Sequence, residues 1–246
     1  QALYEKHKVL TYPRTDSRAL PEDYIATVKD TLNALKETNY GEFARQILKE
    51  NWVIPNKRVF NNTKISDHFA IIPTALEPKK LNEAEAKLYD LVTKRFLAIF
   101  FPAAELLVTT RITRVENEPF RTEGKVMVNP GWQVVYGKTA QHKPDSDTTL
   151  IAITPGKSIT TEAIEVIANQ TRPPARFNEA TLLSAMEGAG KLVEHEELRE
   201  AMRAKGLGTP ATRAAIIEGL VSEHYIQRLG RELQPTAKAF SLITLL

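Results

Sequence analysis

No cysteine occurs among the 246 residues of the sequence. Disulfides, thiolate metal ligands and a thiol nucleophile are therefore all excluded, and the composition fits a reducing compartment such as the cytoplasm. No apolar run approaches the ~20 residues that a membrane-spanning helix requires. The first residues also lack the pattern of a secretory signal peptide. We therefore expect a cytoplasmic protein with no membrane partner.

A strong excess of charge of one sign is absent as well. The 33 Lys and Arg residues against 30 Asp and Glu residues give a net charge of only +3. This balance permits a nucleic-acid partner but does not argue for one. The hydrophobic fraction of 42% and the charged fraction of 26% are ordinary for a folded protein, which excludes disorder and fibrous repeats. The length allows one large domain or two or three small ones.

The first hundred residues show the periodicity of helices. The clearest helix begins at Asn82, because Asn82 can cap it and Glu85, three residues later, completes a capping box. The predicted helices are one that starts at Pro21 and carries an apolar stripe to Leu35, one near residues 43–48, and one that runs from Asn82 towards Pro102.

A different pattern follows. Residues 105–115 alternate between apolar and polar side chains, as a half-buried strand does. No helical pattern separates this strand from those that follow, so we expect an antiparallel sheet. The further predicted strands are residues 120–128, 131–137, 150–154 and 158–167, and Arg172-Pro173-Pro174 marks a boundary after them.

The last part is helical again and ends in a hairpin. We expect a helix from Asn178 to Gly188, a charged helix over 194–205, a third helix opened by Thr209 and Pro210, and a short hairpin around Gly230. Helices followed by a hairpin resemble a winged helix. The predicted fold class is therefore a multidomain α+β protein with domains at residues 1–101, 102–172 and 173–246.

Residues 10–17, Leu-Thr-Tyr-Pro-Arg-Thr-Asp-Ser, contain the groups of a phosphoryl-transfer site. Pro13 biases Tyr12 towards an extended backbone, in which Arg14 can lie on the same side as Tyr12. A phenol needs a neighbouring cation or base to act as a nucleophile at neutral pH, and a guanidinium can bind a phosphate bidentately. The segment fits a tyrosine nucleophile with an arginine clamp. An ordinary turn fits the same residues.

Two further segments could bind phosphate. His68, in the sequence Ser-Asp-His-Phe-Ala-Ile-Ile-Pro-Thr, can hydrogen-bond a phosphate oxygen or act as a general acid, although a lone histidine is often an ordinary surface or core residue. In residues 206–213, two glycines precede a helix N-terminus whose free N–H groups can receive an anion. Thr209 and Thr212 add hydroxyls there and Arg213 adds charge, yet a plain helix cap and loop also fit.

The sequence offers no metal site and no nucleotide site. Asp145 and Asp147 have the spacing of paired metal ligands, but they follow Lys143-Pro144 in a polar loop with no third carboxylate nearby. We expect a solvated loop. No P-loop pattern is present, so nothing indicates the use of ATP.

Taken together, the three segments resemble the motifs of the type IA DNA topoisomerases, and within them the topoisomerase III branch. Residues 10–17 match the active-site tyrosine motif, and Asp67–Thr74 matches a second motif. Residues 173–187 and 206–220 match a third, near the C-terminal end of the catalytic core. The motifs occur in the family's order. The three expected domains would then be the helical domain that bears the tyrosine, the β arch, and part of the winged-helix-like domain that lines the DNA groove.

The resemblance implies a role for each site residue. Tyr12 would attack a phosphodiester of single-stranded DNA, forming a 5′-phosphotyrosine and freeing a 3′-hydroxyl. Arg14 would position the scissile phosphate and stabilise its developing charge, and His68 would contact the DNA nearby. Thr209, Thr212 and Arg213 would lie in the single-strand groove. Because the phosphotyrosine stores the bond energy, no ATP is required.

Two departures from the family pattern matter. Phe69 stands where many topoisomerase III sequences have a second histidine. The family also places a Toprim domain, which binds Mg²⁺ through an Asp-x-Asp-x-Glu pattern, before the tyrosine motif, and no such pattern occurs here. We therefore expect a monomeric fragment that binds single-stranded DNA but is inactive without Mg²⁺ held by Toprim.

Two other interpretations stay open. A non-catalytic, winged-helix-like module that binds duplex DNA would use only residues 175–235, and the small net charge counts against it. A recombinase or relaxase would also use a tyrosine, but relaxases need a histidine cluster. The histidines here are scattered, at positions 7, 68, 142, 195 and 224.

Overall fold

The computed structural model describes residues 1–139, 150–151, 153–192 and 196–245. The chain forms two compact units. The first comprises residues 1–13 and 17–166, and the second comprises residues 14–16 and 167–246. Among the described residues, no helix has the length and apolar character needed to cross a membrane.

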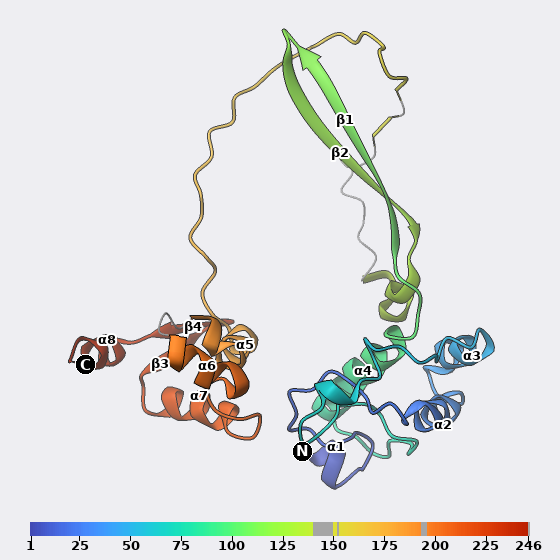
Figure 1. The fold of residues 1–246 in the computed structure, drawn as a ribbon, viewed down its shortest axis with the longest axis vertical. Coiled ribbons are helices and arrows are strands. Elements are labelled where there is room, and N and C mark those ends of the chain that lie inside the picture. The colour runs from blue at the N-terminus through green and yellow to red at the C-terminus, as the bar shows by residue number, and fades with distance from the viewer. Residues whose placement is uncertain (140–149, 152, 193–195, 246) are drawn as a thin grey trace. The chain divides into compact units, whose positions relative to one another are not determined.

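The helical part of the first unit follows the sequence pattern closely (Figure 1). The side-chain oxygen of Asn82 accepts a hydrogen bond from the backbone N–H of Glu85 at 2.9 Å, and the backbone N–H of Asn82 donates to the Glu85 carboxylate at 3.0 Å. The predicted capping box is therefore confirmed. The elements are α1 (Ala2–Glu5), α2 (Ile25–Leu35), α3 (Gly41–Lys49), the short 3₁₀ helix η1 (Asn62–Lys64) and α4 (Glu83–Ala98).

The predicted start of α2 at Pro21 is wrong by one turn. Tyr24 donates its backbone N–H to the carbonyl of Pro21 at 3.0 Å, which makes a turn before the helix. The backbone N–H of Glu22 is bound by the side chain of Asn62 at 3.1 Å. This contact with a distant segment holds the chain outside helical geometry until Ile25.

The core of the first unit lies where the apolar faces of its helices meet the strand-like segments that carry the motifs. A buried residue here keeps its side chain from water and contributes to stability roughly in proportion to the apolar area it buries. The most deeply buried apolar side chains include Val9, Leu20, Val28, Leu32, Ile47 and Leu97.

A two-stranded antiparallel ribbon leaves this core. Strand β1 (Glu105–Val115) pairs with β2 (Glu118–Asn129), with Ile112 opposite Arg121. Glu116 and Asn117 join the strands with φ values of 48° and 69°, which suits the turns that follow the twist of a hairpin. The predictions of strands at 105–115 and 120–128, and of antiparallel pairing, are confirmed. Figure 1 shows the ribbon as a long twisted hairpin whose open end lies beside α4.

The other strands predicted for this region are not formed. Residues 131–137 lie in a 3₁₀ segment, η2 (Gly131–Thr139). The backbone N–H of Trp132 donates to the carbonyl of Pro102 at 2.9 Å, and Gly131 has a φ of 48°, which together turn the chain away from an extended strand. The described residues of 150–154 and 158–167 form no strand, and residue 152 lies outside the described residues. So does the loop that contains Asp145 and Asp147.

The second unit has the predicted helices followed by the predicted hairpin, and a helix that was not predicted comes after the hairpin. The capping residue of α5 is Asn178, which accepts from the backbone N–H of Thr181 at 2.9 Å. The elements are α5 (Glu179–Glu187), the 3₁₀ helix η3 (Ala189–Leu192), α6 (Glu196–Lys205), α7 (Arg213–Ser222), β3 (Ile226–Leu229), β4 (Glu232–Pro235) and α8 (Ala237–Leu245). Residues 194 and 195 of the helix expected at 194–205 lie outside the described residues.

The predicted start of the third helix at Thr209 and Pro210 is wrong. Thr212 and Arg213 both donate their backbone N–H groups to the carbonyl of Thr209, each at 3.0 Å, which closes a turn. Helix α7 begins only at Arg213, after Thr212. Pro210 therefore lies in the turn before the helix.

Candidate active site

The segment that carries Tyr12 pairs with the segment that follows His68. Thr11 donates its backbone N–H to the carbonyl of Ile72 at 3.0 Å, and Thr74 donates to the carbonyl of Val9 at 3.0 Å. Between these bonds, Leu10 and Pro73 face each other in an antiparallel bridge. The first two motifs, which are far apart in the sequence, are thereby joined in one short ladder.

Tyr12 is partly buried and contacts two other rings. Its ring centroid lies 4.1 Å from that of His68, with the ring planes at 36°. It also lies 5.4 Å from that of Tyr4, which meets it edge to face at 87°. His68 is exposed, so a phenol and an imidazole stand side by side at the surface. Two such groups can act on one phosphate, one as nucleophile and one as hydrogen-bond donor or acid.

The chain is also anchored shortly after the tyrosine. The hydroxyl of Ser17 donates to the carbonyl of Lys64 at 2.9 Å, and Ala70 donates its backbone N–H to the carbonyl of Ala19 at 2.9 Å. Arg14 is exposed and falls, with Thr15 and Asp16, in the second unit. The tyrosine motif thus leaves the ladder at Tyr12 and rejoins the first unit at Ser17.

Phe69, the residue after His68, packs inward. Its ring lies 4.8 Å from that of Tyr24, and it packs against the core of the first unit. A phenyl ring in this place stabilises the segment by burial. It also leaves His68 as the imidazole that this segment presents.

The third motif forms a loop before α7 in the second unit. The backbone N–H of Thr209 donates to the hydroxyl of Thr212 at 2.8 Å, and the two hydroxyls lie 3.1 Å apart. Both threonines are exposed. The two side chains therefore lie at the surface before α7, where the helix dipole favours an anion, and their hydroxyls also bond within the loop.

Arg213 behaves differently from the two threonines. Only 6% of it is exposed, and its Nε donates to the carbonyl of Leu207 at 3.1 Å. Gly206 and Gly208, on either side of Leu207, have φ values of 65° and 71°, which glycine adopts without strain. The guanidinium thus holds the loop that the glycines allow to form.

Sequence reasoning singled out Tyr12 and His68 but missed two residues that touch them. Tyr4 stands in α1, eight residues before Tyr12, and it lies outside the tyrosine motif. Thr11 is within the first motif, yet its side-chain partners, Ala70 and Ile72, belong to a segment 59 to 61 residues away. A pairing of this kind is visible only in the folded chain.

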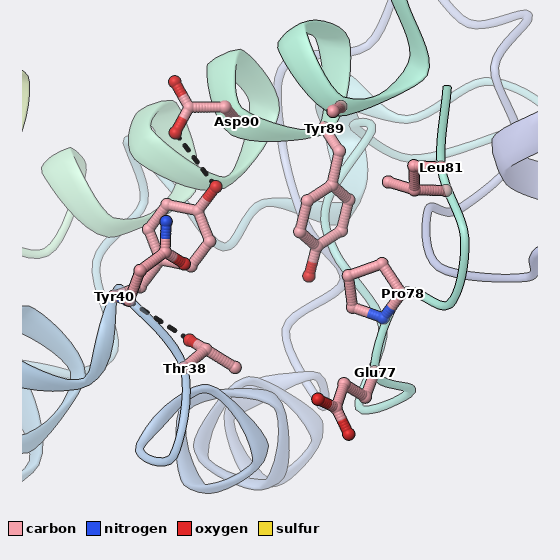
Figure 2. Close-up of a pocket in the computed structure, with 9 residues that line it drawn as sticks. Thr38, Tyr40, Glu77, Pro78, Leu81, Tyr89 and Asp90 are labelled. Carbon is pink, nitrogen blue, oxygen red and sulfur yellow. Dashed lines mark hydrogen bonds between the residues drawn. The ribbon is translucent and has the colours of Figure 1, made fainter. Parts of the chain in front are cut away.

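A surface pocket of about 520 Å³ lies in the same unit (Figure 2). It is lined by residues 38–40, by Glu77, Pro78 and Leu81, and by Ala86, Tyr89 and Asp90 of α4. The hydroxyl of Tyr40 donates to the carboxylate of Asp90 at 2.9 Å. Burial, together with this carboxylate, raises the pKa of Tyr40 far above its ordinary value of 10, and burial raises the pKa of Tyr89. Both phenols stay neutral, and the pocket contains no residue of the three motifs.

The described part of the chain holds no group of three or more His, Asp or Glu side chains that could bind a metal ion. The type IA topoisomerases use Mg²⁺. The residues that the structure describes therefore offer no resident Mg²⁺ site, and the chemistry of Tyr12 is considered below without a metal step.

Comparison with known proteins agrees with the motifs. The family model described as DNA topoisomerase matches residues 1–246. The DNA topoisomerase 3 of Bacillus subtilis (strain 168) is 41% identical over 254 residues, which cover 100% of this chain and 35% of that protein. The DNA topoisomerase 3 of Bacillus licheniformis is 40% identical over 252 residues, which cover 100% of this chain and 34% of that protein. The chain thus spans about a third of the length of these relatives.

A solved structure supports the fold. The full-length topoisomerase I of Thermotoga maritima matches 97% of this chain and 34% of its own, with a TM-score of 0.64 at 22% sequence identity. The α+β fold of this chain is therefore that of part of a topoisomerase I. With three motifs in order, a matching family model and close relatives along its whole length, the chain belongs to the type IA DNA topoisomerases and is similar to topoisomerase III.

Proposed function

We propose that this chain carries the nucleophile of an ATP-independent type IA topoisomerase, and that Tyr12 cleaves one strand of DNA. The observation that supports this most directly is the contact of the Tyr12 ring with the exposed His68 ring at 4.1 Å. The Tyr12 hydroxyl loses its proton as its oxygen forms a bond to phosphorus, the bond from phosphorus to the 3′-oxygen breaks, and that oxygen takes up a proton, so that no proton is gained or lost overall. Reversal by the 3′-hydroxyl reseals the strand after another strand has passed.

The remaining site residues bind and position the DNA. Arg14 is exposed and lies two residues after Tyr12 in the sequence. We therefore assign to Arg14 the role of binding the scissile phosphate and stabilising the charge that develops on it. His68 contacts the DNA beside that phosphate. Thr209 and Thr212 offer exposed hydroxyls to the single strand at the start of α7. Since Arg213 is almost fully buried, it acts by holding residues 206–209 in place.

The proposal divides the work between this chain and the rest of the topoisomerase. Mg²⁺ is held by carboxylates of a Toprim domain, and residues 1–246 alone bind single-stranded DNA as a monomer without cleaving it. The three domains are residues 1–101, 102–172 and 173–246. In this division the ribbon of β1 and β2 belongs to the arch, and α5 to β4 form the winged-helix-like part.

A cleavage assay tests the proposal. A 5′-labelled oligonucleotide and a 3′-labelled one are each incubated with Mg²⁺ and either residues 1–246 alone or the same chain joined to a Toprim domain. We expect the joined protein to attach covalently to the 3′-labelled fragment only, because the phosphotyrosine retains the 5′ end. Tyr12→Phe should abolish the adduct, whereas Tyr225→Phe, which removes a phenol oxygen from the second unit, should leave it.

The order of helices and hairpin in the second unit is also compatible with a second candidate function, a duplex-binding module without catalysis. The same oligonucleotides distinguish the two. Tighter binding of duplex than of single strand, with no Tyr12-dependent adduct in the joined protein, would favour the module and reject the cleavage proposal.

A further inference from the structure

The side chain of Thr11, the residue before the nucleophile, bonds twice to the second motif. Its hydroxyl donates to the carbonyl of Ala70 at 3.1 Å and accepts from the backbone N–H of Ile72 at 2.9 Å. One hydroxyl therefore spans two positions of the partner segment. A hydroxyl can do this because it has both a donor and acceptor lone pairs.

These bonds replace a main-chain bond of the ladder. Leu10 pairs with Pro73, so Thr11 stands opposite Ile72, at a position where two residues of an antiparallel pair exchange both N–H···O bonds. Thr11 donates to Ile72 as expected. The return bond from Ile72, however, ends on the Thr11 side chain and not on its carbonyl. The main-chain pairing thus stops at Thr11, and the next residue, Tyr12, leaves the ladder.

The partner segment is in turn fixed from its other side. Ala70, whose carbonyl receives the Thr11 hydroxyl, donates its backbone N–H to Ala19 at 2.9 Å. Phe69 packs against Tyr24. His68 directly precedes these two anchored residues, so the hydroxyl of Thr11 connects the backbone next to Tyr12 with the backbone next to His68.

We propose that Thr11 is a positioning residue for the reaction: its hydroxyl sets the point at which Tyr12 leaves the ladder and so holds the Tyr12 ring against His68. This inference rests on the proposed function for its catalytic consequence. Its structural part, the dependence of the ring contact on the hydroxyl, stands independently of that function.

The chain provides a matched control at the opposite end of the same ladder. The hydroxyl of Thr74 donates to the carbonyl of Lys8 at 2.8 Å and accepts from the backbone N–H of Leu76 at 3.3 Å. Thr74→Val therefore removes the same kind of bonds as Thr11→Val, away from Tyr12. Valine has the shape of threonine without the hydroxyl, and Thr11→Ser keeps the hydroxyl without the methyl.

The first measurement is made on residues 1–246 by NMR, with the nuclear Overhauser effects between the ring protons of Tyr12 and His68 as the readout. We expect these effects to weaken or vanish in Thr11→Val and to persist in Thr11→Ser and Thr74→Val. Unchanged effects in a folded Thr11→Val protein would overturn the proposal, whether or not the chain takes part in cleavage.

The second measurement is the single-turnover rate of adduct formation in the Toprim-joined protein at saturating oligonucleotide. We expect Thr11→Val to slow this rate by about tenfold, the effect of roughly one net hydrogen bond, with unchanged binding of the oligonucleotide. Thr11→Ser should restore the rate. An equal loss in Thr74→Val, or no loss in Thr11→Val, would show that Thr11 serves only stability. A wild-type protein that forms no adduct would instead reject the proposed function, and the NMR result would still decide the structural part.

Discussion

Gly206 is the position at which a single added methyl group should disturb the third motif most. Its φ of +65° is left-handed, and a Cβ built there would lie 2.4 Å from the carbonyl oxygen of Met186 and 2.6 Å from that of Glu187. Both neighbours are backbone atoms at the end of α5, so neither can swing aside as a side chain would. In Gly206→Ala, left-handed strain costs about 1–2 kcal/mol and the overlap about 1–3 kcal/mol more.

Gly230→Ala separates the two contributions. Gly230 also has a left-handed φ of +60°, but no atom lies within 4 Å of its added Cβ. Gly230→Ala should therefore cost only the strain of about 1–2 kcal/mol. The difference between the two variants measures the overlap with the end of α5.

Hydrogen exchange measured by mass spectrometry reports the second unit directly. For each ~1.4 kcal/mol of extra destabilisation, amides of α5 and α7 should exchange about tenfold faster in Gly206→Ala than in Gly230→Ala, provided they exchange through unfolding of this unit. The two tryptophans, Trp52 and Trp132, lie in the first unit, so their unfolding transition serves as an internal control. Equal exchange rates in the two variants would refute the assignment of a close backbone contact at Gly206.

Two further predictions concern the first unit. Tyr40→Phe should lower the unfolding free energy of the first unit by about 0.5–1.5 kcal/mol, because the hydrogen bond to Asp90 is lost while Lys94 still pairs with that carboxylate at 2.7 Å. Urea titrations followed by tryptophan fluorescence measure this change. No loss of free energy would mean that the hydrogen bond does not stabilise the fold. The backbone N–H of Asn82 lowers the pKa of Glu85 below its ordinary value of 4.5, so the stability that this group contributes is present above that pH and is lost as the pH falls through the lowered pKa. The melting temperature of Glu85→Gln should then fall less than that of the wild type between about pH 6 and pH 3; parallel curves would contradict this.

The elements that could be predicted are those whose signals are local. Asn82 and Glu85 define the start of α4 through bonds within one turn, and the alternation of residues 105–115 defines β1. The errors arise where a distant segment intervenes. Residues 131–137 have a strand-like composition, but the bond from Trp132 to the carbonyl of Pro102 bends them into η2.

The site shows the same distinction. Tyr12, His68, Thr209 and Thr212 were predicted as site residues because their segments resemble family motifs, while the residue patterns alone also fitted an ordinary turn, a lone histidine and a plain helix cap. The contact between Tyr12 and His68 could not be derived, since it depends on the pairing of Leu10 with Pro73. The burial of Arg213 also escaped sequence reasoning, because a charged side chain next to two threonines at a helix start is expected to face solvent.

The anchoring of Tyr12 on both sides has a mechanical consequence. Under the proposed function, a DNA strand attached to Tyr12 transmits tension to the backbone through the phenol. On one side the load enters the hydrogen bonds of Thr11 and Val9 with residues 70–74, and on the other it reaches Ser17 and Lys64. Tension would therefore be shared between two sets of hydrogen bonds within the same unit. The attachment point acts as a clamp that can bear force while the strand is open.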